Sequence, residues 1–147
     1  MITISVCMIV KDEEMVLERA LKSVERIADE IIIVDTGSTD RTKKIALKYT
    51  DKVYDFVWCD DFAKARNYSF SKATMDYCMW LDADDIISDS DQEGLINLKK
   101  TLSKDTSVVM MKYNAEFDQN NKPTFTYYRE RLLRRKDNFI GKDLYMK

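Results

Sequence analysis

The chain alternates short apolar runs with segments in which apolar residues recur every three or four positions. A run of four to eight apolar residues is typical of a buried strand, and the second spacing is typical of an amphipathic helix. The pattern predicts strands over Thr3–Val10, Glu30–Val34, Lys52–Trp58, Tyr77–Leu81, Ser107–Tyr113 and Thr124–Leu133. Helical spacing covers Met15–Ala28, Ile45–Tyr49, Phe62–Ala73 and Leu95–Leu102. Each of the first four strands therefore precedes a helix.

Strands that alternate with helices form βαβ units, whose strands run parallel. The continuous apolar run Ile31–Val34 is typical of a strand buried on both faces of a sheet. In the last third of the chain the order is strand, turn and strand, with the turn at Asn120–Pro123, which indicates an antiparallel pair. We therefore predict an α/β fold, a mostly parallel, Rossmann-like sheet flanked by helices, with a C-terminal antiparallel addition.

The composition is that of an ordinary globular domain. The chain has 147 residues, of which 45% are apolar and 34% charged, so its size predicts one domain. Lys plus Arg number 24 against 26 Asp plus Glu, and the resulting net charge of -2 argues against a nucleic-acid partner. No apolar run approaches the roughly 20 residues of a membrane-spanning helix. We therefore expect a single domain with no transmembrane segment and no nucleic-acid partner.

Two residue types narrow the chemistry and the compartment. Histidine is absent, which excludes Ser-His-Asp triads and His-ligated zinc. The three cysteines include no C-x-x-C pair, which is typical of buried thiols in a reducing compartment. The acidic residues directly after the first strand are unlike a signal peptide. We therefore expect a cytoplasmic protein.

Mainly acidic clusters follow three of the predicted parallel strands, at residues 11–13, 35–40 and 82–85. In an open parallel sheet, ligands bind beyond the carboxyl ends of the strands, so these clusters should meet at one edge. Because like charges repel one another, the carboxylates should share a divalent cation or accept hydrogen bonds from a ligand. Oxygen ligands alone favour Mg²⁺ or Mn²⁺.

The spacing of Asp82 and Asp84 predicts a division of labour between them. Along an extended strand, residues two apart point the same way and lie about 6.6 Å apart. Two carboxylates at that separation do not chelate one ion symmetrically. We therefore expect one carboxylate to bind a hydroxyl group of the ligand and the other to bind the metal. Asp85 points elsewhere unless the strand has already turned. The alternative is a solvated cluster that merely caps the next helix.

A family resemblance is carried by four segments, each at the end of a predicted strand or the start of a helix. They are SVCMIVKDEE at residues 5–14, ADEIIIVDTGSTD at 28–40, ARN at 65–67 and WLDADD at 80–85. Together they resemble the N-terminal half of a family-2 glycosyltransferase with the GT-A fold, and residues 129–134 extend the resemblance more loosely. The resemblance implies a hexosyltransferase-type enzyme that uses a nucleotide-diphosphate sugar, with UDP-sugar favoured.

The resemblance also implies roles for single residues. Val10 and Glu13 match the first loop, which lines the nucleoside, and Asp35 matches the strand-end carboxylate that reads the base. Arg66 matches a position near the base and ribose. Nucleotide-sugar binding is thus implied for Val10, Glu13, Asp35, Arg66 and Asp82, and metal binding for Asp84 and Asp82.

Asp82 and Asp84 match the family's DXD motif, with Asp84 as the expected ligand of a Mn²⁺ or Mg²⁺ ion that bridges the two phosphates. Members of this type invert the anomeric centre in one displacement, while an Asp or Glu removes the proton of the acceptor hydroxyl. That base is unknown here: we consider Glu130, against the favoured alternative of a solvated strand glutamate. Similar sequences continue into a Gly-x-x-His-Glu-like segment, of which only Gly141 is present. We therefore expect residues 1–147 to be one glycosyltransferase-like domain, truncated on its acceptor side.

Two other functions stay open. The first is an incomplete domain that binds nucleotide sugar and metal without turnover. The second, less favoured, is a haloacid-dehalogenase-like phosphatase, whose Asp-x-Asp strand end resembles Trp80–Ile86 and whose first Asp is the nucleophile.

The acceptor is unknown and could be a glycan, a lipid-linked group or a protein. The basic segment Arg129–Lys136 could face an anionic acceptor or the inner face of a membrane, which would make the protein peripheral there, or it could be solvated. A short acceptor side could also leave apolar surface that a homo-oligomer would cover.

Overall fold

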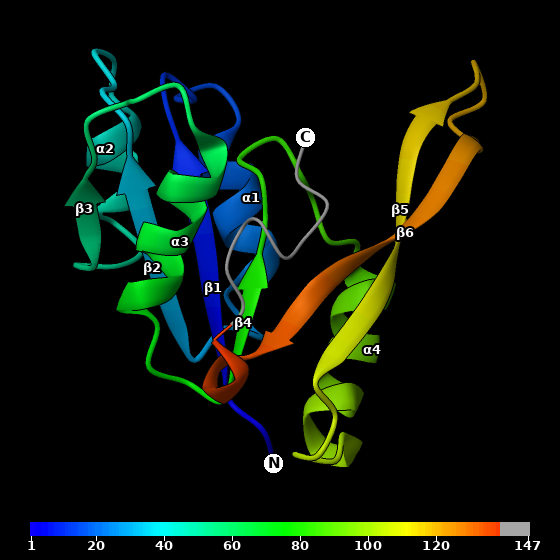
Figure 1. Ribbon diagram of the computed structural model, residues 1–147. Coiled ribbons are helices and arrows are strands. Elements are labelled where there is room, and N and C mark those ends of the chain that lie inside the picture. Colours follow the sequence, from blue (N-terminus) through cyan, green and yellow to red (C-terminus); the bar gives the residue numbers. More distant parts are fainter. Residues whose placement is uncertain (139–147) are drawn as a thin grey trace.

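The computed structural model describes residues 1–138, so Gly141 lies outside the described residues. The strands are β1 (Ile4–Val10), β2 (Glu30–Asp35), β3 (Val53–Asp55), β4 (Tyr77–Trp80), β5 (Val108–Phe117) and β6 (Pro123–Arg134). They form one sheet in the order β3-β2-β1-β4-β6-β5 (Figure 1). The first four strands are parallel, whereas β6 is antiparallel to both β4 and β5. The predicted α/β fold with a C-terminal antiparallel addition is confirmed.

Helices cover both faces of the parallel strands. The helices are α1 (Leu17–Val24), α2 (Thr42–Ala46), α3 (Phe62–Lys72) and α4 (Asp89–Thr101), and the short 3-10 helix η1 (Arg135–Asp137) follows β6. Helix α3 lies against β1 and β2 on one face, and α1, with α2 and α4 beside it, covers the other (Figure 1). Within residues 1–138, no helix combines the length and the apolar character needed to cross a bilayer.

The two faces of the sheet have separate apolar clusters because side chains alternate along a strand. Val6 and Met8 of β1 pack in the large cluster that includes the apolar side of α1, whereas Cys7 between them packs with the smaller cluster near the end of α3. In β2, Ile33 belongs to the first cluster and Ile32 to the second. The expectation that this strand is buried on both faces is confirmed.

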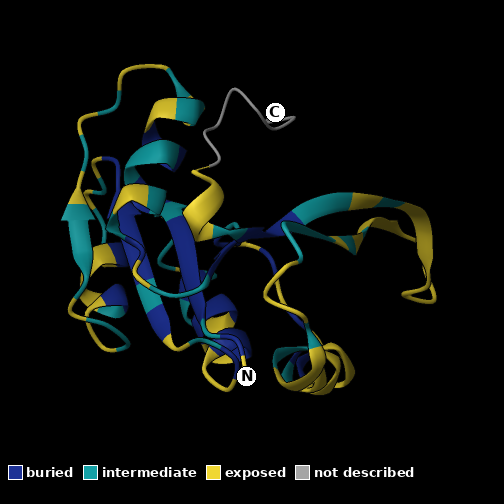
Figure 2. Ribbon diagram, turned by 60° about the horizontal axis from the view of Figure 1, so that its bottom comes forward, coloured by how far each residue is buried: buried dark blue, intermediate teal, exposed yellow. Residues whose placement is uncertain are grey.

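Two strands differ in length from the prediction. β3 is shorter than the predicted Lys52–Trp58, because it lies at the edge of the sheet and pairs only with the last residues of β2. β5 is longer than the predicted Ser107–Tyr113, because it pairs with β6 out to Phe117. The β5–β6 hairpin therefore extends away from the rest of the molecule, and its far end is largely exposed (Figures 1 and 2).

Side-chain caps fix where two helices begin. Asp61 precedes α3 and accepts hydrogen bonds from the backbone N–H groups of Ala63 and Lys64. Ser88 precedes α4 and accepts one from the N–H of Asp91, so that this helix begins earlier than the apolar spacing predicted. Such caps satisfy backbone donors that have no partner inside the helix.

Two of the three cysteines are buried as expected and one is not. Cys7 in β1 and Cys78 in β4 are buried, whereas Cys59 is exposed. The expectation for Cys59 was wrong because the chain leaves the sheet after Asp55, and Cys59 lies in the loop that leads to α3.

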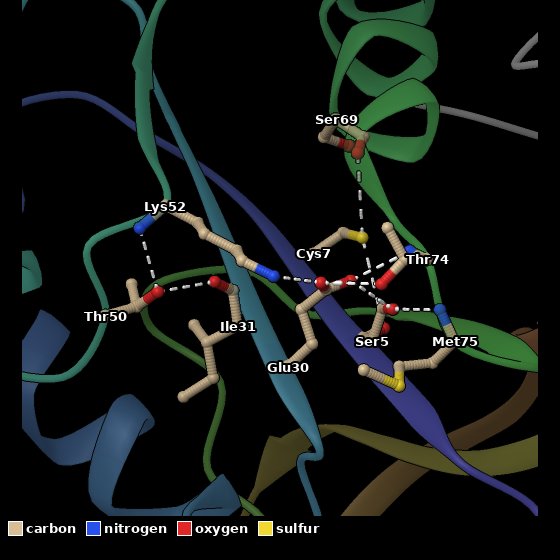
Figure 3. Close-up of polar contacts among 9 residues, drawn as sticks. All are labelled: Ser5, Cys7, Glu30, Ile31, Thr50, Lys52, Ser69, Thr74 and Met75. Atoms are coloured by element: carbon tan, nitrogen blue, oxygen red, sulfur yellow. Dashed lines mark hydrogen bonds and ion pairs between the residues drawn. The ribbon is translucent and has the colours of Figure 1, made fainter.

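A buried polar network ties the amino ends of the strands together (Figure 3). The Glu30 carboxylate, whose side chain is 1% exposed, accepts hydrogen bonds from Ser5 Oγ at 2.7 Å and from the N–H and Oγ1 of Thr74, each at 2.8 Å. It also forms an ion pair with Lys52. Burial by itself would raise the pKa of Glu30, but the hydrogen bonds from Lys52, Ser5 and Thr74 outweigh it and lower the pKa to about 2. This carboxylate is fully engaged within the fold.

Candidate functional site

The opposite, carboxyl edge of the sheet carries the predicted site residues. Val10 ends β1 and pairs in register with Asp35, which ends β2, while Asp82 follows the end of β4. The Val10 side chain is 1% exposed and packs in the core. Its carbonyl oxygen accepts hydrogen bonds from the N–H and the hydroxyl of Thr36, so Val10 ties the ends of β1 and β2 together.

Asp82, Asp84 and Asp85 form a cluster at this edge. One carboxylate oxygen from each lies within 4.8 Å of the others. The expectation of an extended backbone at Asp82–Asp84 was wrong, and the exception stated for Asp85, a strand that has already turned, applies. β4 ends at Trp80, and the chain then turns so that the N–H of Asp85 donates to the carbonyl oxygen of Asp82 at 3.0 Å. The turn brings the third carboxylate in beside the other two.

The three carboxylates differ in how firmly they are held. Asp85 is buried, and burial raises its pKa against the opposing effect of Arg131. Its Oδ1 accepts a hydrogen bond from Tyr113 Oη at 3.1 Å, and its Oδ2 accepts one from the N–H of Asp82 at 3.1 Å. The side chain of Asp82 is half exposed, and Asp84 is exposed. Asp82 and Asp84 are therefore accessible to a ligand, whereas Asp85 anchors the turn.

Arg66 on α3 brings positive charge to the acidic cluster. Its Nη2 lies 3.6 Å from Asp82 Oδ1, and its guanidinium lies 4.7 Å from the centre of the Trp80 ring. The side chain is 6% exposed, and its Nε and Nη1 are buried with no hydrogen-bond partner in the part of the chain that the structure describes. Burial lowers the pKa of Arg66. Buried donors without partners are rare in folded proteins, because leaving them so costs free energy, so they indicate a place for ligand oxygens.

Asp35, like Arg66, has a buried polar atom without a hydrogen-bond partner in the described residues, but its charge is negative. Its Oδ1 accepts hydrogen bonds from the N–H groups of Gly37 and Ser38, each at 2.8 Å. Gly37 has a φ of +115°, which only glycine adopts readily, so the turn that supplies these two donors requires it. Asp35 Oδ2 is buried and has no partner among residues 1–138. One oxygen of this carboxylate thus fixes the side chain, and the other can accept a hydrogen bond from a ligand.

Glu13 lies in the loop after β1, which is cross-linked to the loop after β2. The N–H of Glu13 donates to Thr42 Oγ1 at 2.8 Å, and that of Asp12 donates to Ser38 Oγ at 2.9 Å. Burial raises the pKa of the Glu13 carboxyl, and the negative charge of Asp84 raises it further. Glu13 therefore belongs to the same electrostatic environment as the acidic cluster.

Comparison with known proteins decides the family. Residues 5–145 match the sequence model of Glycosyl transferase family 2. The chain belongs to this family. The predicted family is thus confirmed, and the dehalogenase-like alternative loses its support.

Among family members and other relatives, the chain is 36% identical over 92 residues to an uncharacterized glycosyltransferase of Rickettsia typhi, covering 63% of this chain and 31% of that protein. It is 47% identical over 85 residues to a TPR repeat-containing protein of Synechococcus elongatus, covering 58% of this chain and 21% of that protein. The chain therefore spans about a fifth to a third of the length of these curated relatives.

Solved structures give the same fold. TarS of S. aureus, residues 1–349, is similar with a TM-score of 0.56 and 24% identity, covering 65% of this chain and 32% of that one. Glucosyl-3-phosphoglycerate synthase of M. tuberculosis is similar with a TM-score of 0.51 and 26% identity, covering 58% of this chain and 34% of that one. The synthase was crystallised with Mg²⁺ and UDP, and also with Mn²⁺ and UDP-glucose. The predicted GT-A-like architecture is confirmed.

Within this family-2 fold, the structure adds two site residues that sequence reasoning missed. Tyr113 of β5 and Arg131 of β6 both contact Asp85. Glu130, the candidate base, lies next to Arg131, and the contact it makes to the site is through its backbone oxygen, which accepts a hydrogen bond from Trp80 Nε1. The sequence did show that Arg131 is a basic residue in the last predicted strand. Nothing in the neighbouring residues indicates that its partner is Asp85, 46 residues earlier.

Proposed function

We propose that this chain is the donor-binding part of a glycosyltransferase that takes a UDP-sugar and, with a bound divalent cation, transfers the sugar with inversion to an acceptor hydroxyl. The observation that carries the proposal is the meeting of accessible carboxylates, from Asp82 and Asp84, with the unpartnered buried donors of Arg66 at one edge of the sheet. Family membership and the UDP complexes of a similar synthase support it.

The residues at the cluster fit Mn²⁺ or Mg²⁺. Asp82, Asp84 and Asp85 offer only oxygen atoms, and these lie close enough together to surround one ion. We assign Asp84 and Asp82 as the ligands, because both are accessible, and Asp85 as the support that holds the turn. Such an ion, when bound, supplies Lewis-acid stabilisation of the negative charge on the departing diphosphate.

The chain's own residues would bind the rest of the donor. Arg66 has two hydrogen-bond donors, Nε and Nη1, that can bind oxygen atoms of the nucleotide sugar near its ribose and diphosphate. Burial strengthens such charge-assisted hydrogen bonds. Asp35 Oδ2 can accept a hydrogen bond from an N–H group of the base. Glu13 lies in the adjoining loop, whose register Val10 and Thr42 fix.

The acceptor half of the reaction needs a catalytic base. Glu130 is the base candidate, and removal of the acceptor's proton requires its carboxylate to reach the attacking hydroxyl. The acceptor class stays a choice between a glycan, a lipid-linked group and a protein. A second candidate function is donor binding without turnover, which the contact of Glu130 favours, because it reaches Trp80 through its backbone oxygen.

Calorimetry with UDP and uridine, in Mn²⁺ and in EDTA, tests the proposal. We expect Asp84→Ala to weaken Mn²⁺-dependent UDP binding about tenfold or more and to leave uridine binding unchanged, because the side chain acts on the metal. Asp35→Ala should weaken uridine and UDP alike. Asp105→Ala, an exposed carboxylate before β5, is the matched control and should change neither.

Equal losses of both ligands in both variants would contradict the assignment of these roles. Release of UDP from UDP-glucose by the wild-type chain would support the enzyme. Tight binding of UDP-glucose without its breakdown would favour the second candidate.

A further inference from the structure

The β5–β6 hairpin reaches the acidic cluster through two side chains, Tyr113 and Arg131. Tyr113 Oη donates to Asp85 Oδ1 at 3.1 Å, and Arg131 Nη1 lies 3.4 Å from Asp85 Oδ2. The side chains of Arg131 and Asp85 are 6% and 8% exposed, so their charges meet away from water. Each oxygen of Asp85 is thus engaged by a different strand of the hairpin.

An irregularity in the hairpin accompanies this contact. Val109 of β5 pairs with Leu132 of β6, but the next residue, Met110, pairs with Glu130, so Arg131 is an extra residue in the ladder. Such a bulge re-aims a side chain and is frequent next to functional sites. Here the re-aimed side chain is the one that reaches the cluster.

The face of the Trp80 indole holds Arg131 in place. The Arg131 guanidinium lies over the ring, 3.9 Å from its centre, and Arg131 Nη1 donates to the Trp80 carbonyl oxygen at 3.2 Å. The ring of Tyr113 lies 5.0 Å from the same guanidinium. Independently of Asp85, Arg131 is therefore held by ring stacking and by the hydrogen bond to Trp80, as a rigid support should be.

We propose that Tyr113 and Arg131 are positioning residues of the metal site, which act through Asp85 on the two exposed carboxylates. Asp85 accepts the N–H of Asp82 and closes the turn, so fixing Asp85 fixes where Asp82 and Asp84 point. Neither hairpin residue needs to touch the ion. This inference rests on the proposed function in one respect, namely that the accessible carboxylates bind a divalent cation.

A purely structural ion pair makes a different prediction. If Tyr113 and Arg131 only help to fasten the hairpin, their loss lowers stability and leaves the affinity of the folded protein for Mn²⁺ unchanged. If they position the turn, the affinity falls in protein that is still folded. Partners one step removed from a metal typically change its affinity 10- to 100-fold.

The test is a titration of Mn²⁺ into the chain, alone and with UDP, at a temperature where circular dichroism finds every variant folded. We expect Tyr113→Phe, which removes one hydroxyl, and Arg131→Lys, which keeps the charge but loses the planar fork, each to weaken Mn²⁺ binding about tenfold. UDP affinity in EDTA should stay within about twofold of wild type.

Two matched controls lie on the same strand. Tyr128→Phe removes the same hydroxyl from an exposed side chain. Arg134→Lys alters an arginine whose bonds go to Asp137, Ser107 and the Lys104 backbone, away from the cluster. Both should leave Mn²⁺ affinity unchanged, even where Arg134→Lys lowers the melting temperature.

A double-mutant cycle tests whether Tyr113 changes the Mn²⁺ affinity through Asp85. Once Asp85→Ala has removed both acceptor oxygens, adding Tyr113→Phe should cause no further loss of Mn²⁺ affinity. Additive losses would overturn the proposal, as would unchanged Mn²⁺ affinity in both Tyr113→Phe and Arg131→Lys. If wild type binds Mn²⁺ in an Asp84-dependent way while these variants match it, only this inference fails. If wild type binds no Mn²⁺, the proposed metal site and this inference both fail.

Discussion

Two groups of buried polar side chains lie at opposite ends of the same sheet, and only one of them is satisfied by the fold. At the amino ends of the strands, the Glu30 carboxylate is engaged by Ser5, Thr74 and Lys52. At the carboxyl ends, Asp35 Oδ2 and two donors of Arg66 are buried with no partner in the described part of the chain. Folded proteins keep few such groups, so the difference separates the end that holds the fold together from the end at which we propose that the ligand binds.

The largest expected effect is on stability, from removing the satisfied carboxylate. Glu30→Ala leaves the buried Ser5 hydroxyl without its acceptor and removes the hydrogen bonds from Thr74 and the ion pair with Lys52. We therefore expect the free energy of unfolding to fall by about 4 kcal/mol in urea denaturation. UDP affinity of the folded variant should not change. Glu25→Ala, an exposed carboxylate nearby, is the control. A loss of UDP affinity in Glu30→Ala protein that is still folded would break the comparison.

The pH dependence of stability should also show the contribution of the Glu30 carboxylate. The pKa of Glu30 is lowered from 4.5 to about 2, so the contribution of this carboxylate to folding is complete above about pH 4.5 and is lost as the pH falls through about 2. The difference amounts to roughly 3 kcal/mol. Urea denaturation between pH 7 and pH 2 should therefore converge for wild type and Glu30→Gln at the acid end. Parallel curves over this range would mean that Glu30 is not held as described.

The smallest effect has the opposite sign and concerns the unsatisfied end. Arg66→Met replaces a buried guanidinium with an apolar side chain, at the loss of the contacts to Asp82 and Trp80, and we expect stability to rise by about 1 kcal/mol. UDP affinity should fall at the same time. Arg26→Met, a surface arginine paired with Glu93, is the matched control and should change neither quantity. A less stable Arg66→Met would show that Arg66 serves the fold, and the contrast between the two ends would disappear.

The sequence predicted the sheet well because its signal is local. The continuous apolar run Ile31–Val34 indicates a strand buried on both faces, whatever the rest of the chain contains. Turn residues such as those after Asp35 indicate the end of a strand in the same local way. Strand ends in a parallel sheet share an edge, so the pattern also predicted that Asp35 and Asp82 would lie at the same edge.

The predictions that were wrong depended on contacts between distant residues. An extended backbone at Asp82–Asp84 was a reasonable extrapolation of β4, but the sheet ends at Trp80 and the chain turns there. The buried position of Cys59 was expected from composition, and the early end of β3 exposes it. For β3, its place at the sheet edge beside β2 alone decided the outcome, and after β4 the end of strand pairing at Trp80 did.

The sequence by itself determined the α/β order of elements, the family and the edge of the sheet at which the acidic residues gather, because hydrophobic period and short motifs act over a few residues. Only the tertiary structure decided that Asp85 joins the cluster, that Tyr113 and Arg131 hold it, and that Arg66 and Asp35 keep atoms without a partner among residues 1–138. Those facts depend on where a bulge in β6 and a turn after β4 place side chains from distant parts of the chain. Hydrogen bonding is satisfied across the whole fold at once, so no local stretch of sequence records which groups are left over.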